Sequence, residues 1–441
     1  VTLSYYRVSQ RGVFLKKIVR LLGILFVFAL CAVYFLPAVQ SYANIPGEIY
    51  VEKGVAKTID LGLPVEAEVD STDVVSLGGE TLAEATGMQR PLVIQPVKNG
   101  DAVIELKLLG VPVKKVKVNV TEERVVIPGG QSIGVTLFTR GALVVGITGI
   151  ELENGTIVNP AREAGMLPGD VIVRINGQEV SSATDVTRIV NESEGALDIT
   201  VERDGRTLNF NVEPVRDYAD GKLRLGIWVR DDTAGVGTLT FIEPNTRWFA
   251  GLGHAITDID TGHVLSVRKG EIYFSEIIQI NKGESGIPGE IQGFFSSASG
   301  SIGRIVKNTE YGIYGVLMNN VDLSRFQKPI PVARRDEVRL GPAMIYSTID
   351  HRGVRPFSCE IVKLSEQSIP GQKGMVIHIT DPELLSRTGG IVQGMSGSPI
   401  VQDGKLVGAV THVFVNNPTK GYGLYADWML QQIDSSDKTI K

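Results

Sequence analysis

Glycine occurs throughout this chain and restricts it to folds built from short elements joined by turns. The sequence holds 50 glycines in 441 residues, and they recur between short apolar runs. Alternation of apolar and polar residues, as at 102–106 and 114–118, is typical of half-exposed strands. The hydrophobic fraction of 43% is ordinary for a globular protein, and the length allows about three domains. The sequence therefore predicts a mostly β protein.

The N-terminal 43 residues indicate export. Five basic residues lie within 7–20 and precede an unbroken apolar run at 21–36. This order is typical of an exported segment whose basic side stays in the cytoplasm. The run is long for a signal peptide and slightly short for a full membrane span. Residues 41–43 could serve as a cleavage site, so cleavage and retention both stay open, and we favour a retained membrane anchor over 1–43. Residues after about 44 are then expected outside the cytoplasm.

The charge and cysteine content argue against a nucleic-acid-binding protein and against a disulfide-stabilised one. The net charge is −5 with a pI near 5.7, which provides no basic face for nucleic acid. Cys31 lies in the apolar run and Cys359 in the C-terminal half, so no disulfide framework is expected. Cys359 is expected to be a small buried hydrophobe. No motif calls for a cofactor. Residues 44–122 are expected to form a small β domain that serves as a spacer or docking module.

The next unit, at 123–216, resembles PDZ domains. It carries Ala-Gly-x-x-Pro-Gly-Asp at 164–170 and an Asn-Gly pair at 176–177, which suits a type I′ hairpin turn. Residues 185–190 would form the helix beside the peptide groove. The resemblance implies an apolar-Gly-apolar loop that binds a peptide carboxylate, and a strand to which the peptide adds. The residues matched to the loop and strand are Ile133, Gly134, Val135, Thr136, Leu137 and Phe138. The alternative is a unit that acts only as a spacer.

The sequence Gly-Met-Ser-Gly-Ser-Pro at 394–399 resembles the nucleophile loop of trypsin-like proteases. Small residues on both sides of Ser396 let the backbone turn sharply and bring N–H groups close to a carbonyl oxygen. The resemblance implies Ser396 as nucleophile, with the N–H groups of Gly394 and Ser396 forming the oxyanion hole. The alternative is an ordinary Ser/Gly turn before a strand.

A serine nucleophile needs a base, and five histidines are available. These are His254, His263, His351, His378 and His412. We select His254 because it lies in a small-residue turn, Gly-Leu-Gly-His-Ala, as the base of trypsin-like proteases does. It also precedes Ser396 by about 140 residues, in the chain order of that fold.

The third member of a triad orients the base and stabilises its cation. The residues available for this role are Asp258, Asp260, Asp322, Asp350 and Asp381. Asp258 and Asp260 are close to His254 but are typical turn residues. Asp322 stands where the trypsin-like chain order favours an acid, and Asp381 ends a strand 15 residues before Ser396. These residues alone leave the choice open.

Taken together, the exported N-terminus, the PDZ-like unit and the two catalytic motifs resemble the stage IV sporulation protein B peptidases of endospore-forming bacteria. The resemblance covers nearly the whole chain. It implies a trypsin-like double β-barrel protease domain at 223–432, with His254 as base, Ser396 as nucleophile and Asp381 as acid. Asp381 departs from the acid position of ordinary trypsin-like proteases.

The resemblance also implies a role in sporulation signalling. Such a protease acts between the two forespore membranes, where it cleaves the membrane-associated regulator of an intramembrane metalloprotease, which then processes a pro-sigma factor. It also cleaves itself, and residues 37–60 are a plausible site. The expected partners are therefore protein substrates at the membrane, the membrane itself through the anchor, and peptide tails at the PDZ groove, including the chain's own.

Two other hypotheses compete with this one. The spacing His254-x3-Asp258-x-Asp260-x2-His263 contains metal-ligand residue types, but it matches no helix-borne zinc motif, and no metal is expected. The rival function is a catalytically idle PDZ scaffold at the membrane, and a wall-binding β protein is a third. Covalent labelling of Ser396 separates the enzyme from the scaffold, and wall retention without any peptidase activity would favour the wall-binding protein.

Overall fold

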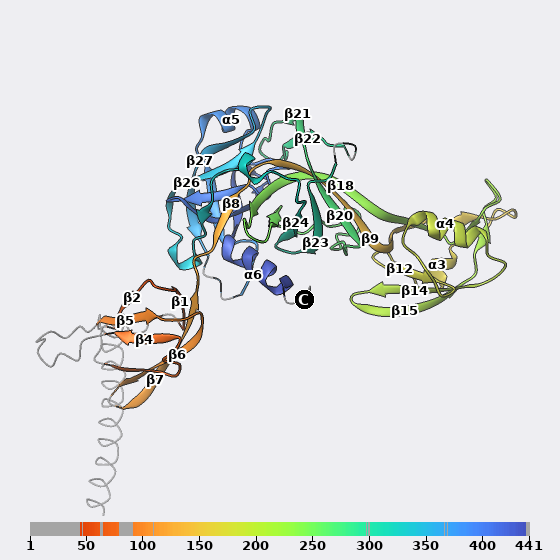
Figure 1. The fold of residues 1–441 in the computed structure, drawn as a ribbon. Helices are drawn as coiled ribbons and strands as arrows, with labels where there is room; N and C mark the ends of the chain where they lie inside the picture. The colour runs from red at the N-terminus through yellow and green to blue at the C-terminus, as the bar shows by residue number, and fades with distance from the viewer. Residues whose placement is uncertain are drawn as a thin grey trace, which may run out of the picture. The chain divides into compact units, whose positions relative to one another are not determined.

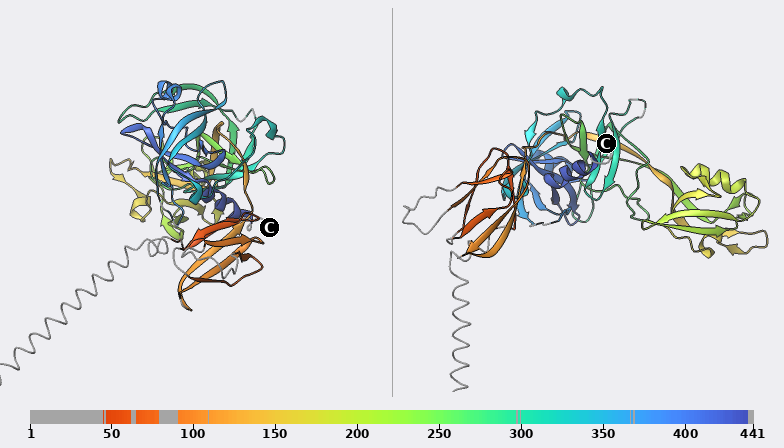
Figure 2. Two further views of the ribbon diagram at one scale, coloured as in Figure 1. Left: turned by 90° about the vertical axis from the view of Figure 1, so that its left-hand side faces the viewer. Right: turned by 60° about the horizontal axis from the view of Figure 1, so that its bottom comes forward.

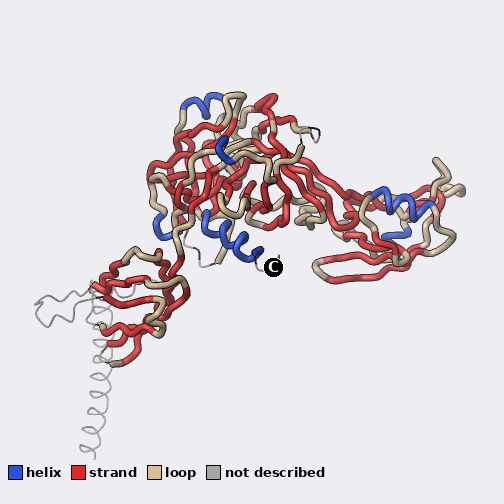
Figure 3. Tube along the Cα trace, viewed as in Figure 1, coloured by secondary structure: helices blue, strands red, loops and turns tan. Residues whose placement is uncertain are grey.

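The computed structural model describes residues 45, 47–61, 65–78, 91–108, 110–296, 298, 300–365, 367 and 369–437. Strands dominate these residues, and the helices are short (Figure 3). The described residues up to Glu123 form one compact unit and those from Arg124 form a second. The predicted anchor at 1–43 lies outside the described residues, and none of the described helices is long and apolar enough to span a membrane.

The first unit consists of two sheets around an apolar core, in the region where a small β domain was expected. Its strands are β1 (Glu48–Glu52), β2 (Lys57–Asp60), β3 (Glu66–Val69), β4 (Val75–Gly78), β5 (Pro91–Pro96), β6 (Gly100–Leu108) and β7 (Val111–Thr121). One sheet has the order β1-β7-β6-β3 and the other β2-β5-β4. Alternate residues of β6 and β7, such as Ile104 and Val118, are fully buried, because successive side chains of a strand point to opposite faces.

The second unit begins with a closed ring of strands. Its members are β9 (Ser132–Ile147), β20 (Lys269–Phe274), β23 (Gly303–Thr309), β24 (Gly312–Leu317), β19 (Trp248–Gly251) and β18 (Ile227–Ile242). They pair in this order, and β18 also pairs with β9, which closes the ring. Elements attached to the ring are β8 (Val125–Pro128), β21 (Glu276–Asn281), β22 (Glu290–Phe294), η2 (Leu323–Arg325), β25 (Ile330–Pro331) and η3 (Arg335–Glu337).

The C-terminal part forms a second closed barrel with the order β26-β27-β28-β31-β30-β29. Its elements are β26 (Gly341–Thr348), β27 (Val354–Leu364), β28 (Met375–Ile379), α5 (Pro382–Thr388), β29 (Pro399–Gln402), β30 (Lys405–Phe414), β31 (Asn417–Tyr425) and α6 (Ala426–Asp437). Cys359 is buried in its core, and burial raises the pKa of its thiol to about 12, as expected for a small hydrophobe. The expected double barrel is therefore present.

The PDZ-like domain is inserted into the first barrel and does not precede it. Its elements are β10 (Ile150–Glu151), β11 (Ile157–Val158), α3 (Pro160–Glu163), β12 (Val171–Ile175), β13 (Gln178–Glu179), α4 (Ala183–Asn191), β14 (Leu197–Arg203), β15 (Arg206–Val212), β16 (Val215–Arg216) and β17 (Leu223–Arg224). In the chain these elements lie between β9 and β18. Each of these two strands is 16 residues long and runs from the barrel into the inserted domain (Figures 1 and 2). Residues 132–138 therefore belong to the barrel, and the domain starts later than the expected residue 123.

The helix of the inserted domain follows from its local sequence. Ser182 caps the N-terminus of α4 by accepting a hydrogen bond from the Asp185 N–H. Val186, Ile189 and Val190 recur at helical spacing and are buried against the sheet β15-β14-β12-β9. The Asn-Gly pair also has the backbone that a type I′ turn requires, since Asn176 and Gly177 both have positive φ, of 49° and 76°.

Candidate active site

The loop that carries Ser396 is wedged between the two barrels. Gly394 and Gly397 both have a φ of 94°. A Cβ on Gly397 would lie 2.2 Å from the carbonyl oxygen of Thr238, so only glycine fits there. Thr238 holds the loop in return, because its N–H donates to Ser396 O at 3.0 Å and its hydroxyl donates to Gly394 O at 2.7 Å. The small residues of the motif thus let a strand of the first barrel fix the serine of the second.

His254 reaches the same place from the first barrel. Strand β19 ends at Gly251, and Leu252 and Gly253 then turn the chain with φ values of 67° and 68°. The Nδ1 atom of His254 lies 2.8 Å from the carbonyl oxygen of Ala255. A carbonyl only accepts, so Nδ1 carries the proton and Nε2 is left as the basic nitrogen. Burial lowers the pKa of His254 below its ordinary value, and the bond to Ala255 opposes this shift only in part.

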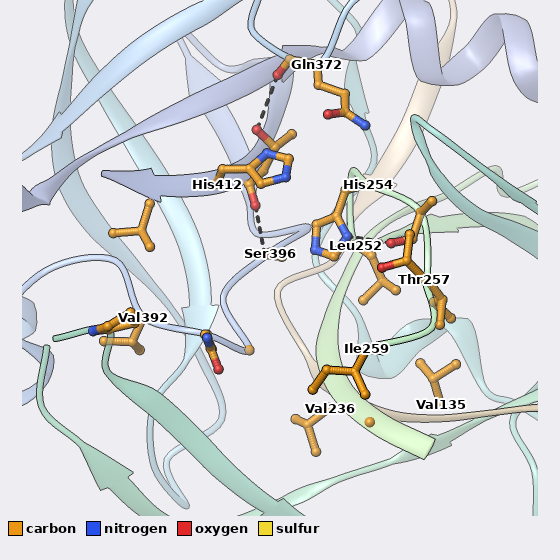
Figure 4. A pocket seen from close by; sticks show the side chains of 18 of the residues that line it. Val135, Val236, Leu252, His254, Thr257, Ile259, Gln372, Val392, Ser396 and His412 are labelled. Carbon is orange, nitrogen blue, oxygen red and sulfur yellow. Dashed lines mark hydrogen bonds between the residues drawn. The ribbon is translucent and has the colours of Figure 1, made fainter. Parts of the chain in front are cut away.

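His254 and Ser396 line one cavity of about 1030 Å³ (Figure 4). The first barrel contributes apolar side chains that include Val236 and Leu252, and the second contributes Ile391, Val392 and Val413. Among the described residues that line the cavity, Glu310 is the only one that carries a formal charge. The cavity therefore suits an extended apolar segment of a polypeptide.

No hydrogen bond joins the nucleophile Ser396 to the base His254 in this structure. The hydroxyl of Ser396 donates to the carbonyl oxygen of Thr411 at 2.8 Å. His254 lies beside a second imidazole, that of His412, with 5.3 Å between the ring centroids. For catalysis the Ser396 hydroxyl must donate to Nε2 in place of the Thr411 carbonyl, and catalytic hydrogen bonds are often unformed in ligand-free enzymes.

The N–H groups selected for the oxyanion hole are available. Within the described chain, those of Gly394 and Ser396 have no acceptor, whereas Met395 N–H donates to Val392 O and Gly397 N–H to Val410 O. Unpaired N–H groups beside a nucleophile are what an oxyanion needs. Their role remains a prediction that this geometry supports.

Asp381 lies elsewhere. Its carboxylate caps helix α5, accepting from the Leu384 N–H at 2.9 Å and the Ser358 N–H at 3.3 Å, and it does not line the cavity. No contact between Asp381 and His254 is present, and Nδ1 of His254 faces the Ala255 carbonyl instead. The assignment of Asp381 as acid therefore stays a prediction without support from this geometry.

The other candidate acids also have different partners. Asp322 caps η2, and Asp350 pairs with arginines that include Arg352 and Arg355. Asp258 and Asp260 both contact Arg230, at 2.6 and 2.8 Å. Across the described parts of the chain, no group of three or more His, Cys, Asp or Glu side chains is arranged to hold a metal ion. The metal-like spacing after His254 thus corresponds to an ion-paired turn.

The prediction that residues 133–138 form the peptide-binding loop and strand of the PDZ-like domain is wrong. Residues 133–138 of β9 pair with β20 on one side and with β18 on the other, so they offer no free edge. A Cβ on Gly134 would lie 2.0 Å from the ring of Phe295, which explains the glycine without a carboxylate ligand. The apolar-Gly-apolar pattern at 133–135 therefore serves barrel packing.

A groove with the expected properties lies instead between α4 and the start of β18. It has a volume of about 380 Å³ and is lined by Val186 and Val190 of the helix and by residues 225–229. Leu225-Gly226-Ile227 repeats the apolar-Gly-apolar pattern, Gly226 has a φ of 78°, and within the described chain the Leu225 and Gly226 N–H groups have no acceptor. Only β9 pairs with β18 over 227–230 among the described strands, so the other edge is free. The apolar-Gly-apolar signal of the peptide-binding loop was therefore present in the sequence, but at the C-terminal end of the PDZ-like unit.

Comparison with known families agrees with this organisation. The family model described as SpoIVB peptidase S55 matches residues 221–430, and the model of the PDZ domain matches residues 143–213. The second range excludes 133–138, as the strand pairing does.

Curated relatives share only part of the chain. A putative zinc metalloprotease of Brucella suis biovar 1 (strain 1330) is 35% identical over 120 residues, which are 26% of this chain and 30% of that protein. The regulator of sigma-W protease RasP of Bacillus subtilis (strain 168) is 34% identical over 87 residues, 19% of this chain and 21% of that protein. The chain thus spans less than a third of the length of these relatives.

Solved structures show a weaker likeness. The active form of the Rv3671c protease from M. tuberculosis is 13% identical with a TM-score of 0.26, covering 46% of this chain and 74% of that one. The HtrA-type protease AlgW with a decapeptide is 12% identical with a TM-score of 0.27, covering 47% and 54%. A likeness of this size carries no inference about activity.

Proposed function

Because residues 221–430 belong to the SpoIVB peptidase S55 family and residues 143–213 to the PDZ domains, we propose that this chain is a serine endopeptidase with Ser396 as nucleophile and His254 as base. The observation that carries the proposal is the meeting of these two side chains, one from each barrel, in a single cavity. The idle scaffold is less well supported, since such a protein has no need of an unpaired Nε2 beside a serine loop with free N–H groups.

The reaction is acyl transfer. Ser396 Oγ attacks the scissile carbonyl carbon while Nε2 of His254 takes its proton, and the N–H groups of Gly394 and Ser396 stabilise the oxyanion. The protonated imidazole gives this proton to the leaving amine as the C–N bond breaks. Water, deprotonated by His254, then hydrolyses the acyl-enzyme and regenerates the serine. The Ala255 carbonyl keeps Nδ1 protonated throughout, which is the orienting part of a triad acid's role.

The substrate of this proposal is a membrane-associated regulator of an intramembrane metalloprotease, cleaved to trigger pro-sigma factor processing during sporulation. The family name supports the sporulation context. Two of the similar proteins are named a putative zinc metalloprotease and a regulator of sigma-W protease, which fits a setting shared with such enzymes. The proposal also includes a membrane anchor at 1–43, which keeps the catalytic part in the forespore intermembrane space, and self-cleavage of the chain. The apolar cavity is suited to an extended apolar segment of such substrates.

The test is self-cleavage and fluorophosphonate labelling of the full chain in detergent micelles. We expect the wild type to shorten over hours and to label at Ser396, and both reactions to fall at least about a thousandfold in Ser396→Ala and His254→Gln. Ser398→Ala is the matched serine control, because its hydroxyl is buried in the same loop and contacts Ser347. His351→Gln is the histidine control, because His351 is exposed away from the cavity.

Each result has a definite meaning for the proposal. Loss in the two catalytic variants with full activity in the two controls supports the enzyme. A wild type that neither shortens nor labels sinks the proposal and favours the PDZ scaffold. Processing of Ser396→Ala in a purified system shows that another residue is the nucleophile.

A further inference from the structure

One strand connects the peptide groove of the PDZ domain with the substrate cavity of the protease domain. At its start, Ile227, Trp228 and Val229 of β18 line the groove. Further along, residues 233–236 of the same strand line the cavity that holds His254 and Ser396. Arg230 lies between these two stretches of β18, next to Val229, the last groove residue.

Arg230 holds two carboxylates of a neighbouring hairpin. Its Nη1 contacts Asp258 Oδ2 at 2.6 Å, and its Nη2 contacts Asp260 Oδ2 at 2.8 Å. The Asp258 side chain is only 1% exposed, whereas that of Asp260 is 49% exposed. Burial alone would raise the pKa of Asp258, but hydrogen bonds from Thr261 and Arg230 outweigh it and lower that pKa. Asp258 is therefore a buried anion whose charge is balanced by a residue of β18.

The hairpin at 256–265 forms one wall of the substrate cavity. It begins two residues after His254 and is closed by hydrogen bonds from Asp258 N–H to His263 O and from Leu265 N–H to Ile256 O. Ile256, Thr257, Ile259 and Val264 line the cavity. Any movement of this hairpin therefore changes the shape of the substrate-binding surface.

The hairpin is fixed at both ends by different domains. At its base, Asn308 of the barrel accepts from the Ile256 N–H at 2.8 Å and donates to the carbonyl oxygens of Ile256 and Leu265. At its tip, the ring of His263 lies against Gly169 of the PDZ domain, since a Cβ there would be 2.6 Å from the ring. Arg230 is the charged contact that joins this tip to β18.

We infer that Arg230 is a positioning residue for the proposed peptidase reaction. Its two ion pairs with Asp258 and Asp260 form a clasp. Through this clasp Arg230 holds the 256–265 hairpin in the position that completes the substrate-binding wall. The inference rests on the proposed function and deepens it. Because Arg230 adjoins the free edge of β18 at 227–229, a peptide that adds to this edge restrains the strand that carries the clasp.

The experiment uses the full chain and a fluorogenic peptide that spans the self-cleavage site found by mass spectrometry. For Arg230→Gln we expect KM to rise about tenfold with kcat changed less than about threefold, because the wall binds substrate while Ser396 and His254 stay held by the barrels. Asp260→Asn removes only the exposed half of the clasp and should raise KM by about threefold. Arg230→Lys keeps the charge but not the two-pronged contact, so it should lie between Arg230→Gln and the wild type.

The matched control is Arg352→Gln. Arg352 also bridges a buried and an exposed carboxylate, Asp350 and Glu383, but at α5, outside the cavity lining. Labelling of Ser396 by a small fluorophosphonate and the midpoint of thermal unfolding are measured for every variant. Labelling should stay within about twofold of the wild type, because a small reagent does not need the hairpin wall.

The outcomes separate the two proposals. An active wild type with an unchanged KM in Arg230→Gln and Asp260→Asn overturns the inference and leaves the peptidase standing. Equal losses of labelling, kcat and thermal stability in these variants also overturn it, because they mean a purely structural ion pair. A wild type without hydrolysis or labelling refutes the proposed function itself. A KM increase in both clasp variants, absent from Arg352→Gln, supports the inference.

Discussion

The hydroxyl of Ser396 donates to the main-chain carbonyl oxygen of Thr411 at 2.8 Å and makes no hydrogen bond to His254. Thr411 belongs to β30, and its carbonyl lies in the cavity where an extended substrate would offer N–H groups. A substrate N–H that takes this carbonyl releases the hydroxyl toward Nε2. Side-chain rotations of this kind take picoseconds to nanoseconds, so the resting contact does not limit turnover.

The pH dependence of hydrolysis reports on the environment of His254. Burial lowers the pKa of this imidazole, and its only orienting partner among the described residues is the neutral carbonyl of Ala255. Only the neutral imidazole acts as base, so kcat/KM should rise with pH and level off above the pKa of His254. We expect the midpoint of this rise below about 6.5, the ordinary value for histidine. A midpoint clearly above it would mean that a carboxylate stabilises the imidazolium, against the present geometry.

Two substitutions at Asp381 distinguish a helix cap from a triad acid. Asparagine caps helices about as well as aspartate, so Asp381→Asn should keep α5 and its stability while removing the charge. We expect this variant to retain at least about half of the wild-type kcat/KM. Asp381→Ala removes the cap and should lower the unfolding free energy by about 1 kcal/mol.

The measurements for Asp381 are peptide hydrolysis and thermal unfolding of the full chain. A fall in kcat of about four orders of magnitude in Asp381→Asn, with unchanged unfolding, would show that Asp381 acts as the acid after all. Such a result would also imply a second arrangement in which His254 leaves the Ala255 carbonyl.

Two glycines test the location of the peptide groove. A Cβ on Gly226 would lie 2.7 Å from Thr148 O in a backbone with positive φ, so Gly226→Ala should distort the loop beside α4. We expect it to weaken binding of a fluorescein-labelled heptapeptide that ends in a free valine carboxylate by at least about tenfold. Gly134→Ala should instead lower the midpoint of unfolding, because its Cβ would meet the ring of Phe295.

Fluorescence anisotropy of the full chain gives these affinities, with the C-terminal amide of the same heptapeptide as the control ligand. The amide should bind weakly, because the free N–H groups of Leu225 and Gly226 are matched to a carboxylate. Unchanged affinity in Gly226→Ala, or equal binding of acid and amide, would remove this loop from the binding site.

The catalytic loops could be predicted because their requirements are local. Glycine is needed at 397 because a Cβ there would lie 2.2 Å from Thr238 O, and the turn at 252–253 needs residues with positive φ. Short motifs record such demands directly. His254 and Ser396 could therefore be selected from the sequence, and the structure places both in one cavity.

The insertion of the PDZ domain into the barrel could not be predicted in this way. It depends on the pairing of β9 with β18, whose residues are about 80 to 106 positions apart, and no local pattern records such a partner. The same pairing made the motif at 133–135 misleading, because its strand is covered on both sides. Asp381 is a different case, since Asp-Pro before a helix is itself an N-cap signal that the search for an acid overlooked.

Asp427 in helix α6 provides a prediction about stability. Burial raises the pKa of its carboxyl to about 6, and Arg335, 2.7 Å away, opposes this shift only in part. The folded state then binds more protons than the unfolded state between about pH 4 and 6, so this group makes the unfolding free energy fall as pH rises through that window. The charged form at pH 7.5 costs up to about 3 kcal/mol relative to the protonated form.

Asp427→Asn removes this titration. The unfolding free energy of the variant minus that of the wild type should therefore be larger at pH 7.5 than at pH 4.5, by about 2 kcal/mol. Denaturant unfolding of both chains at the two pH values measures the difference. Asp434→Asn is the control on the same helix, because Asp434 forms an exposed ion pair with Arg124 and its loss should change stability by less than about 1 kcal/mol at either pH. A pH-independent difference between Asp427→Asn and the wild type would mean that Arg335 keeps Asp427 charged throughout, and that the ion pair outweighs the cost of burial.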